Sequence, residues 1–384
     1  MEYKRKLIYL TGFFIAMAMA LTSFINSSYL ENYTNKNYVG MFFALGSILA
    51  IWGLSKMPKI LNRYGNRKTM LYLCLISFGS LLTMALSQNA IAVILAFIIM
   101  FASQSFIITS LDIFLEDFSR NSSVGSIRGL YLTFVNLAWV IAELASAIIL
   151  GDSKNFFWVI YLLASLFILL ASWIIYFHIK NFKDPEYIKT TTVKNLKFFL
   201  KNKNIFKVYI LNLSLRFFFA WMVIYTPIYL HEYIGLPWGK IGIIFAIMLL
   251  PFVILDYPLG KLSDKFGEKE MLIAGFIISA IATFCIPFLS KPEIYVWGSI
   301  LFITRIGAAT IEDMTEIYFF KSVPKENEGA LSFFRNANSI AYLLAPILAL
   351  LIFLLTPSFE YIFFVLGVIM LCGALISIRL KDIK

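Results

Sequence analysis

Charged residues are scarce in this chain. Of its 384 residues, 14% are charged and 60% are hydrophobic. Soluble domains usually carry about 25% charged residues, and continuous apolar runs of about 20 residues are typical of membrane spans. Because such runs recur from one end of the sequence to the other, no stretch remains for a separate soluble domain.

Residues that ligate metals or form disulfides are also few. Cys74, Cys285 and Cys372 each fall in an apolar run, and His178 and His231 lie near the ends of two others. The sequence contains no Gly-x-x-x-x-Gly-Lys-Ser/Thr loop and no nucleophile–base pattern. We therefore predict no disulfide framework, no metal site, no cofactor, no nucleotide-driven pump and no enzyme.

The apolar runs predict an all-α membrane protein with twelve spanning helices. These lie near residues 7–27, 38–55, 69–87, 90–111, 129–150, 156–178, 207–230, 240–260, 271–290, 294–316, 329–354 and 358–379. An even number of spans places both termini on the same side of the membrane.

The net charge of +11 follows this topology. Of the 33 lysines and arginines, 26 lie on the side of the termini, four lie on the other side and three arginines fall within spans. Basic residues concentrate on the cytoplasmic side of membrane proteins, so both termini are predicted to be cytoplasmic. The basic balance is therefore explained without a nucleic-acid partner.

The sequence repeats itself with a period near 200 residues. Residues 63–68 match residues 265–270 at an offset of 202, and the acidic pattern of residues 110–116 matches that of residues 310–316 at an offset of 200. Two halves of one ancestry explain this ordered set of matches.

A polar stretch at residues 256–269 predicts a short hinge between two spanning helices. Gly260 and Gly267 suit close backbone approach and a tight turn. Asp264 suits a helix start or a nearby cation, and Lys265 favours the cytoplasmic side. The order Gly-x-Leu-Ser-Asp-Lys-x-Gly-x-Lys resembles the signature loop of the major facilitator superfamily (MFS) of secondary transporters.

This resemblance implies two six-helix bundles that rock about a central site. The halves are expected at residues 1–178 and 207–384, joined by a basic cytoplasmic linker at residues 179–206. In the family, the first, fourth, seventh and tenth helices line the central cavity. The linker has an apolar and a basic helical face, which fits either a helix on the inner membrane surface or a solvated connection.

The first-half copy of the signature loop departs from the family pattern. Pro58 replaces its first glycine and Asn62 replaces its aspartate, whereas Arg63 and Arg67 keep basic charge there. Asparagine forms hydrogen bonds but supplies no charge. A gating ion pair at this loop is therefore expected to be weaker or built differently.

Two arginines within spans are candidates to bind cargo. Arg305 lies about eleven residues into its span, near the midplane, and Arg216 lies in the span near 207–230. Ionisable residues in a membrane need a partner, water or a function. A guanidinium fork suits a carboxylate or phosphate, so both arginines are predicted to bind an anionic solute. The alternative is that each arginine pairs permanently with an acid or caps helix carbonyls.

Glu143 is the deepest acid, in the span near 129–150. Loss of water disfavours the charged form of a carboxylate, which suits a group that exchanges protons during transport. Glu143 is therefore the candidate for proton coupling. The alternative is a glutamate held in a permanent salt bridge.

Two acid pairs lie at the cytoplasmic ends of the fourth and tenth spans. They are Asp112 with Glu116, and Glu312 with Glu316. A four-residue spacing puts each pair on one helical face, where cations must offset the repulsion. By resemblance to the family, these acids, the basic loops and Arg335 form latches that hold the inner gate shut. A solvated helix end is the alternative.

Uncharged polar residues are further candidates to line the cavity. They are Asn26, Gln104, Asn136, Asn212 and Tyr225. Such residues also bond between helices without any contact to cargo. Aromatic residues near the outer span ends are assigned only to anchoring in the headgroup layer, and they are Trp158, Tyr233, Trp238, Tyr295 and Trp297.

The sequence therefore favours a multi-pass transporter of the cell membrane that moves a small polar or anionic solute by alternating access, coupled to protons. Its partners are expected to be that small molecule and the lipid bilayer, and it is expected to be monomeric. An uncoupled facilitator, or a transporter-shaped sensor or scaffold, stays an alternative because the first-half loop is degraded.

Overall fold

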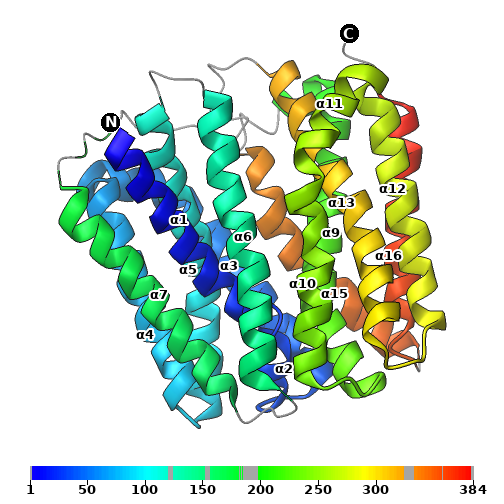
Figure 1. Cartoon of the computed structure of the whole chain (residues 1–384), viewed down its shortest axis with the longest axis horizontal. Coiled ribbons are helices and arrows are strands. Elements are labelled where there is room, and N and C mark those ends of the chain that lie inside the picture. The colour runs from blue at the N-terminus through cyan, green and yellow to red at the C-terminus, as the bar shows by residue number, and fades with distance from the viewer. Residues whose placement is uncertain are drawn as a thin grey trace. The chain divides into compact units, whose positions relative to one another are not determined.

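The computed structural model describes residues 2–119, 124–151, 156–180, 182, 184, 198–323, 333–356 and 358–381. Every regular element in these ranges is helical (Figure 1), so the predicted all-α fold is confirmed. The longer elements are α1 (Glu2–Ser23), α2 (Asn26–Glu31), α3 (Val39–Tyr64), α4 (Asn66–Leu86), α5 (Ala90–Ser119), α6 (Val124–Leu150), α7 (Phe157–His178), α9 (Lys203–Ile228), α10 (Trp238–Ile254), α11 (Asp256–Phe266), α12 (Glu268–Cys285), α13 (Ile294–Ser322), α15 (Ala337–Leu355) and α16 (Tyr361–Ile378). Short helical turns occupy Lys36–Tyr38, Tyr229–Tyr233 and Ile286–Phe288.

Eleven helical segments of the described chain are long and apolar enough to cross a membrane, and Trp238–Ile254 is a shorter apolar helix. Large apolar side chains also remain exposed along them, such as Trp52 at 63% and Ile148 at 84%. Lipid rather than water is the solvent that suits such surfaces. The chain is therefore a multi-pass membrane protein. The number of twelve spans and the side of the termini stay predictions.

The chain divides into two compact units. The first comprises Met1–Lys189 with Pro237–Gly242, and the second comprises Thr190–Leu236 with Ile243–Lys384. The first turn of α10 thus belongs to the first unit, and the rest of α10 belongs to the second.

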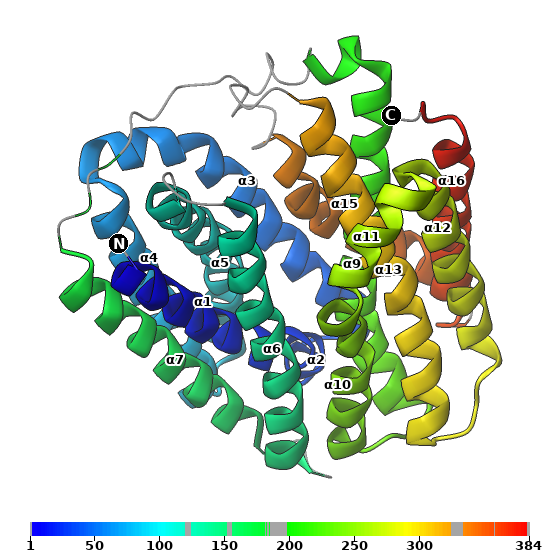
Figure 2. The ribbon, with the colours of Figure 1, turned by 45° about the horizontal axis from the view of Figure 1, so that its top comes forward.

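The two units repeat the same helix neighbours. In the first unit, α4 packs against α5 and α7, while α1 packs against α5, α6 and α7. Figure 2 shows α1 lying between α6 and α7. In the second unit, α12 packs against α13 and α16, while α9 packs against α13, α15 and α16. Each of these relations has a counterpart about 200 residues away, as an internal repeat requires.

Small residues let α12 and α13 cross closely in the second unit. A Cβ added to Gly307 would collide with the Gly275 carbonyl and with Ser279. The Ser279 hydroxyl donates to the Thr304 carbonyl at 3.3 Å across the same crossing. Close backbone approach at small residues is a usual way to pack membrane helices, where lipid removes the hydrophobic drive between them.

The polar stretch predicted as a hinge is itself helical, which corrects that prediction. α10 ends at Ile254 and α11 begins at Asp256, so the predicted spanning helix near 240–260 is divided. Pro258 has no amide hydrogen to donate to the carbonyl four residues earlier, and this missing bond accounts for the break at Leu255.

The chain turns sharply at two matching glycines. Gly267 joins α11 to α12 with a φ of +88°, and Gly65 joins α3 to α4 with a φ of +76°. Glycine adopts such angles without the steric cost that a Cβ imposes. Of the two glycines predicted to allow close approach and a tight turn, Gly267 makes the turn, and Gly65 is its counterpart in the first unit.

Two of the aromatic residues assigned to the headgroup layer are buried instead. Trp238 is 2% exposed and packs on Phe157 with ring centres 5.2 Å apart. Trp297 is 0% exposed and donates from its indole nitrogen to the Lys291 carbonyl at 2.9 Å. Their anchoring role was wrongly predicted because a nearby span end does not reveal which way a side chain points.

The last part of the linker is anchored in the second unit. Phe199 is fully buried, with ring centres 5.4 Å from Tyr209 and 4.8 Å from Phe333. Leu200, predicted on the same apolar face, is 55% exposed. The preceding residues of the predicted surface helix lie outside the described part of the chain.

Candidate functional site

Arg305 is a buried cation in the second unit. It lies on α13, and only 2% of its surface is exposed. The guanidinium carbon lies 5.1 Å from the ring centre of Phe218 and 5.2 Å from that of Phe219, both on α9. Aromatic faces attract a cation through their quadrupole. Within the described residues, Nε and Nη1 of Arg305 have no hydrogen-bond partner, so these donors remain available to an anion.

A second arginine forms an ion pair next to it. Nη2 of Arg216 lies 2.8 Å from Oε1 of Glu312, and these side chains are 21% and 27% exposed. The Arg216 guanidinium also lies 5.7 Å from the ring centre of Phe219, which thus contacts both arginines. Glu312 follows Arg305 by seven residues, which is two turns along the same face of α13.

Tyr342 contributes from α15. It interacts electrostatically with both Arg305 and Arg216, and Glu312 interacts with Arg305 in the same way. We call Arg216, Phe218, Phe219, Arg305, Glu312 and Tyr342 the arginine cluster. Its charged members are two cations and one carboxylate.

Sequence reasoning found part of this cluster. Both arginines were predicted as cargo ligands, and Glu312 was predicted for a gate rather than as a partner of Arg216. Phe218 and Phe219 were missed, although aromatic residues two and three positions after an intramembrane arginine are a usable signal for cation–π contacts. Nothing in the apolar sequence around Tyr342 distinguishes it from core residues.

Other polar groups on α9 are buried in the second unit. The Trp221 indole nitrogen and the Tyr225 hydroxyl have no hydrogen-bond partner within the described residues, and each residue is 1% exposed. Asn212 donates from Nδ2 to the Phe334 carbonyl at 3.2 Å. Asn212 therefore holds α9 to the segment before α15, whereas Trp221 and Tyr225 keep free donors.

Glu143 is a buried acid in the first unit. It lies on α6, it is 2% exposed, and its Oε1 has no hydrogen-bond partner within the described residues. Its backbone carbonyl lies beside the first turn of α10, where a Cβ added to Gly242 would come within 2.8 Å. No ion pair of Glu143 is found in the part of the chain that the structure describes.

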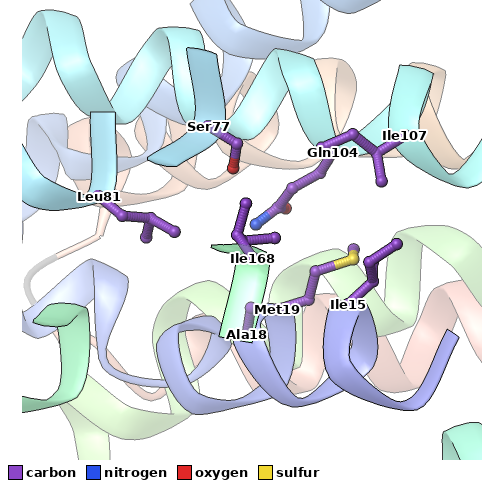
Figure 3. A pocket seen from close by; sticks show the side chains of 8 residues that line it. All are labelled: Ile15, Ala18, Met19, Ser77, Leu81, Gln104, Ile107 and Ile168. Atoms are coloured by element: carbon purple, nitrogen blue, oxygen red, sulfur yellow. The ribbon is translucent and has the colours of Figure 1, made fainter. Parts of the chain in front are cut away.

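In the first unit, Asn26 forms a hydrogen bond between helices, whereas Gln104 lines a small cavity. Asn26 Oδ1 accepts a hydrogen bond of 2.9 Å from the Tyr161 hydroxyl, so α2 is tied to α7. Gln104 of α5 and Ser77 of α4 line a cavity of about 10 Å³ whose other walls are apolar (Figure 3). That volume holds about one water. Asn136 lies half-buried on α6.

The basic residues of the first-half loop contact their own unit. Arg67 donates to the Tyr176 carbonyl at 2.7 Å, near the end of α7. The Arg63 guanidinium lies 5.2 Å from the Tyr64 ring centre. In the second-half loop, Lys265 Nζ lies 5.3 Å from the Phe266 ring centre. None of these contacts is itself an ion pair.

The remaining predicted gate residues are only partly described. Asp112 is half-buried on α5, Glu316 is half-buried on α13, and Arg335 is exposed just before α15. The surroundings of Glu116, Gly260 and Asp264 lie outside the described part of the structure. Their gating role stays a prediction.

Each unit places a carboxylate at the start of one helix, and sequence reasoning missed both arrangements. In the first unit, Asp184 Oδ1 accepts a hydrogen bond of 2.6 Å from the Asn66 amide at the start of α4. In the second, Glu268 at the start of α12 forms an ion pair of 2.6 Å with Lys321. A carboxylate at a helix N-terminus is favoured by the helix dipole.

Comparisons with known proteins agree with this architecture. Residues 8–329 and 239–383 match the sequence profile described as Major Facilitator Superfamily. No curated protein matches the chain in sequence. Among solved structures, the nucleoside transporter NupG is similar with a TM-score of 0.77 and 11% identity, covering 97% of this chain and 98% of that one. A structure titled for substrate recognition in proton dependent oligopeptide transporters gives 0.76 and 11%, covering 98% of each chain.

At such low identity, the structural similarity shows the fold and leaves the cargo open. The profile match, which spans nearly the whole chain, shows the family and makes the protein a transporter rather than an enzyme. The chain belongs to the Major Facilitator Superfamily of secondary transporters.

Proposed function

We propose that this protein carries a small anionic solute across the cell membrane by alternating access, with Arg305 as the group that binds the anion. The observation that carries this proposal is the buried guanidinium of Arg305, whose Nε and Nη1 have no partner within the described residues. An arginine at the centre of a membrane helix costs about 2.5–3.5 kcal/mol on insertion scales. A bound carboxylate or phosphate would offset that cost and fill the free donors.

The neighbours of Arg305 support cargo binding over a purely structural role. The rings of Phe218 and Phe219 stabilise the charge without occupying its N–H groups. Arg216 is instead paired with Glu312, so it fits the alternative of a structural ion pair better than Arg305 does. Trp221 and Tyr225 offer further donors on the same helix as Phe218.

Proton coupling is proposed to run through Glu143. Its burial disfavours a permanent charge, and no ion pair holds it ionised within the described residues. A carboxylate that alternates between a protonated and an ionised form can link proton movement to cargo movement. Asp264 and the neighbouring loop residues are proposed to control the inner gate, as the family resemblance implies.

The decisive test is solute counterflow in proteoliposomes that contain the purified protein. Vesicles preloaded with one unlabelled anion should accumulate its labelled form, and a panel of carboxylates, phosphates, nucleosides and cations would identify the class. We expect counterflow with at least one anion and its loss in Arg305→Ala. Counterflow only with neutral or cationic solutes, or full activity in Arg305→Ala, would overturn the proposal.

A further inference from the structure

The arginine cluster has a net charge of plus one, because it contains two guanidinium groups and one carboxylate. Arg216 is paired at 2.8 Å with Glu312, whose field also reaches Arg305. Two guanidinium groups thus share one carboxylate, and Arg305 holds the excess charge. In a low-dielectric interior, a charge that stays uncompensated is strongly unfavourable, and so is a surplus of the opposite sign.

We propose that this site selects a monovalent carboxylate, and that Glu312 sets the valence. This inference rests on the proposed function, because it concerns the same anion at Arg305. A monovalent carboxylate brings the cluster to neutrality. With a dicarboxylate or another divalent anion bound, the site has a net charge of minus one, next to the carboxylate of Glu312.

The shape of the cluster favours a carboxylate group that enters beside the ion pair. Arg305 is 2% exposed, whereas the Arg216 and Glu312 side chains are 21% and 27% exposed, so the ion pair is the accessible side of the cluster. Phe218 and Phe219 flank the guanidinium and leave its N–H edges as the polar surface. A planar guanidinium edge matches the two oxygens of a carboxylate.

The charge count makes a prediction that a structural ion pair would not make. Glu312→Gln raises the net charge of the cluster from plus one to plus two. The affinity for divalent anions should therefore rise more than the affinity for monovalent anions. The ratio of the two affinities should shift by roughly ten-fold, the effect of one charge at about 10 Å in an effective dielectric of about 20. Arg216→Gln should weaken monovalent binding, because it removes a positive charge and leaves Glu312 unpaired.

The double variant Arg216→Gln/Glu312→Gln separates charge from contact. It has lost the ion pair, yet its net charge is again one, and two facing amides can bond to each other. Its preference for monovalent over divalent anions should therefore return to that of the parent. If Glu312→Gln fails to fold, Arg216→Gln still tests the charge count, because a parent-like affinity for monovalent anions in that variant would contradict it.

Binding is measured with the purified full-length protein in detergent, as the rise of the thermal unfolding midpoint with anion concentration. Lactate, gluconate and benzoate serve as monovalent probes, and succinate and malate serve as divalent ones above neutral pH at matched ionic strength. Arg379→Gln, an exposed site at the end of α16, is the matched control.

The outcomes separate this inference from the proposed function. Protection by the monovalent probes, with a ten-fold shift toward divalent probes in Glu312→Gln, supports it. Equal or better protection of the parent by divalent probes overturns the valence rule and leaves anion transport standing. If the ratio of divalent to monovalent affinity is unchanged in Glu312→Gln, the valence rule is likewise overturned and anion transport still stands. No protection by any anion, together with no anion counterflow, overturns both.

Discussion

The two units share their helix neighbours but differ in the charges buried on their matching helices. The first unit buries Glu143 on α6, and the residue 200 positions later on α15 is Leu343. The second unit buries Arg305 on α13, and the residue 200 positions earlier on α5 is Ser105. Glu143 and Arg305 therefore each correspond to an uncharged residue in the other half. This difference is consistent with the roles proposed above, anion binding for Arg305 and proton coupling for Glu143.

The same helix crossing is also packed differently in the two units. In the second, Ser279 bonds to the Thr304 carbonyl, and Gly307 lets the backbones approach. In the first, Ser77 and Gln104 occupy the matching positions, and they line a cavity (Figure 3). The close approach in the second unit lies only two residues along α13 from the buried cation, because Gly307 follows Arg305 by two positions. A rigid crossing there would hold Arg305 against Phe218.

Filling the tight crossing should have the largest effect. Gly307→Val places a branched side chain against Gly275 and Ser279, so we expect little or no folded protein by size-exclusion chromatography. Gly307→Ala should lower stability by about 1–3 kcal/mol, the usual effect of overpacking. Gly79→Ala is the control, because its added Cβ meets nothing within 4 Å. Equal stability of the two alanine variants would contradict the difference between the units.

Removing the buried cation should have the next largest effect. Arg305→Ala should weaken anion binding by about a hundred-fold, within the range for truncating one partner of a buried charge pair. Arg305→Lys keeps the charge but loses the planar fork, so binding should fall less. Anion-dependent thermal shifts measure both, with Arg379→Ala as the exposed control. Equal binding by Arg305→Ala and the control would make Arg305 a structural residue.

Neutralising the buried acid should change coupling and spare exchange. Glu143→Gln keeps the shape of the side chain and removes its titration. In proteoliposomes with an inward proton gradient, uphill accumulation of the anion should be lost, while counterflow without a gradient persists. Glu293→Gln, an exposed acid in the described chain, is the control. If Glu143→Gln still accumulates the anion, Glu143 is structural and the protein is an uncoupled facilitator or uses another acid.

Patterns within single segments could be predicted from the sequence. Long apolar runs gave the helices, and the 200-residue offset gave the repeat that the helix neighbours follow. Arg305 and Glu143 were found because a charge in an apolar run has no local explanation. The turn at Gly267 was predictable because its signature loop requires a residue without a Cβ.

Partners distant in the sequence could not be predicted. The pairing of Arg216 with Glu312 depends on the rotation of α9 against α13, which hydropathy leaves undetermined in helices that are apolar on every side. The Asn26–Tyr161 bond and the burial of Trp297 depend on packing in the same way. The break at Leu255 was missed because the apolar run continues without interruption up to this point. Pro258 was nevertheless a usable signal, since proline cannot donate to the carbonyl four residues before it.

The smallest expected effect concerns the N-termini of α4 and α12, where the two units place a carboxylate from different parts of the chain. The carboxylate at the start of α12 is that of Glu268, which belongs to the helix itself. The carboxylate at the start of α4 is that of Asp184, which lies in the linker. Asp184→Asn removes a charge at the N-terminus of α4 and weakens the acceptor for the Asn66 amide, so it should cost about 0.5–1 kcal/mol. Hydrogen exchange of the Asn66 amide should accelerate, while exchange in the first turn of α12 should stay unchanged. Equal acceleration in both turns would mean that the linker acts on the whole protein, and no acceleration would mean that Asp184 does not hold the start of α4.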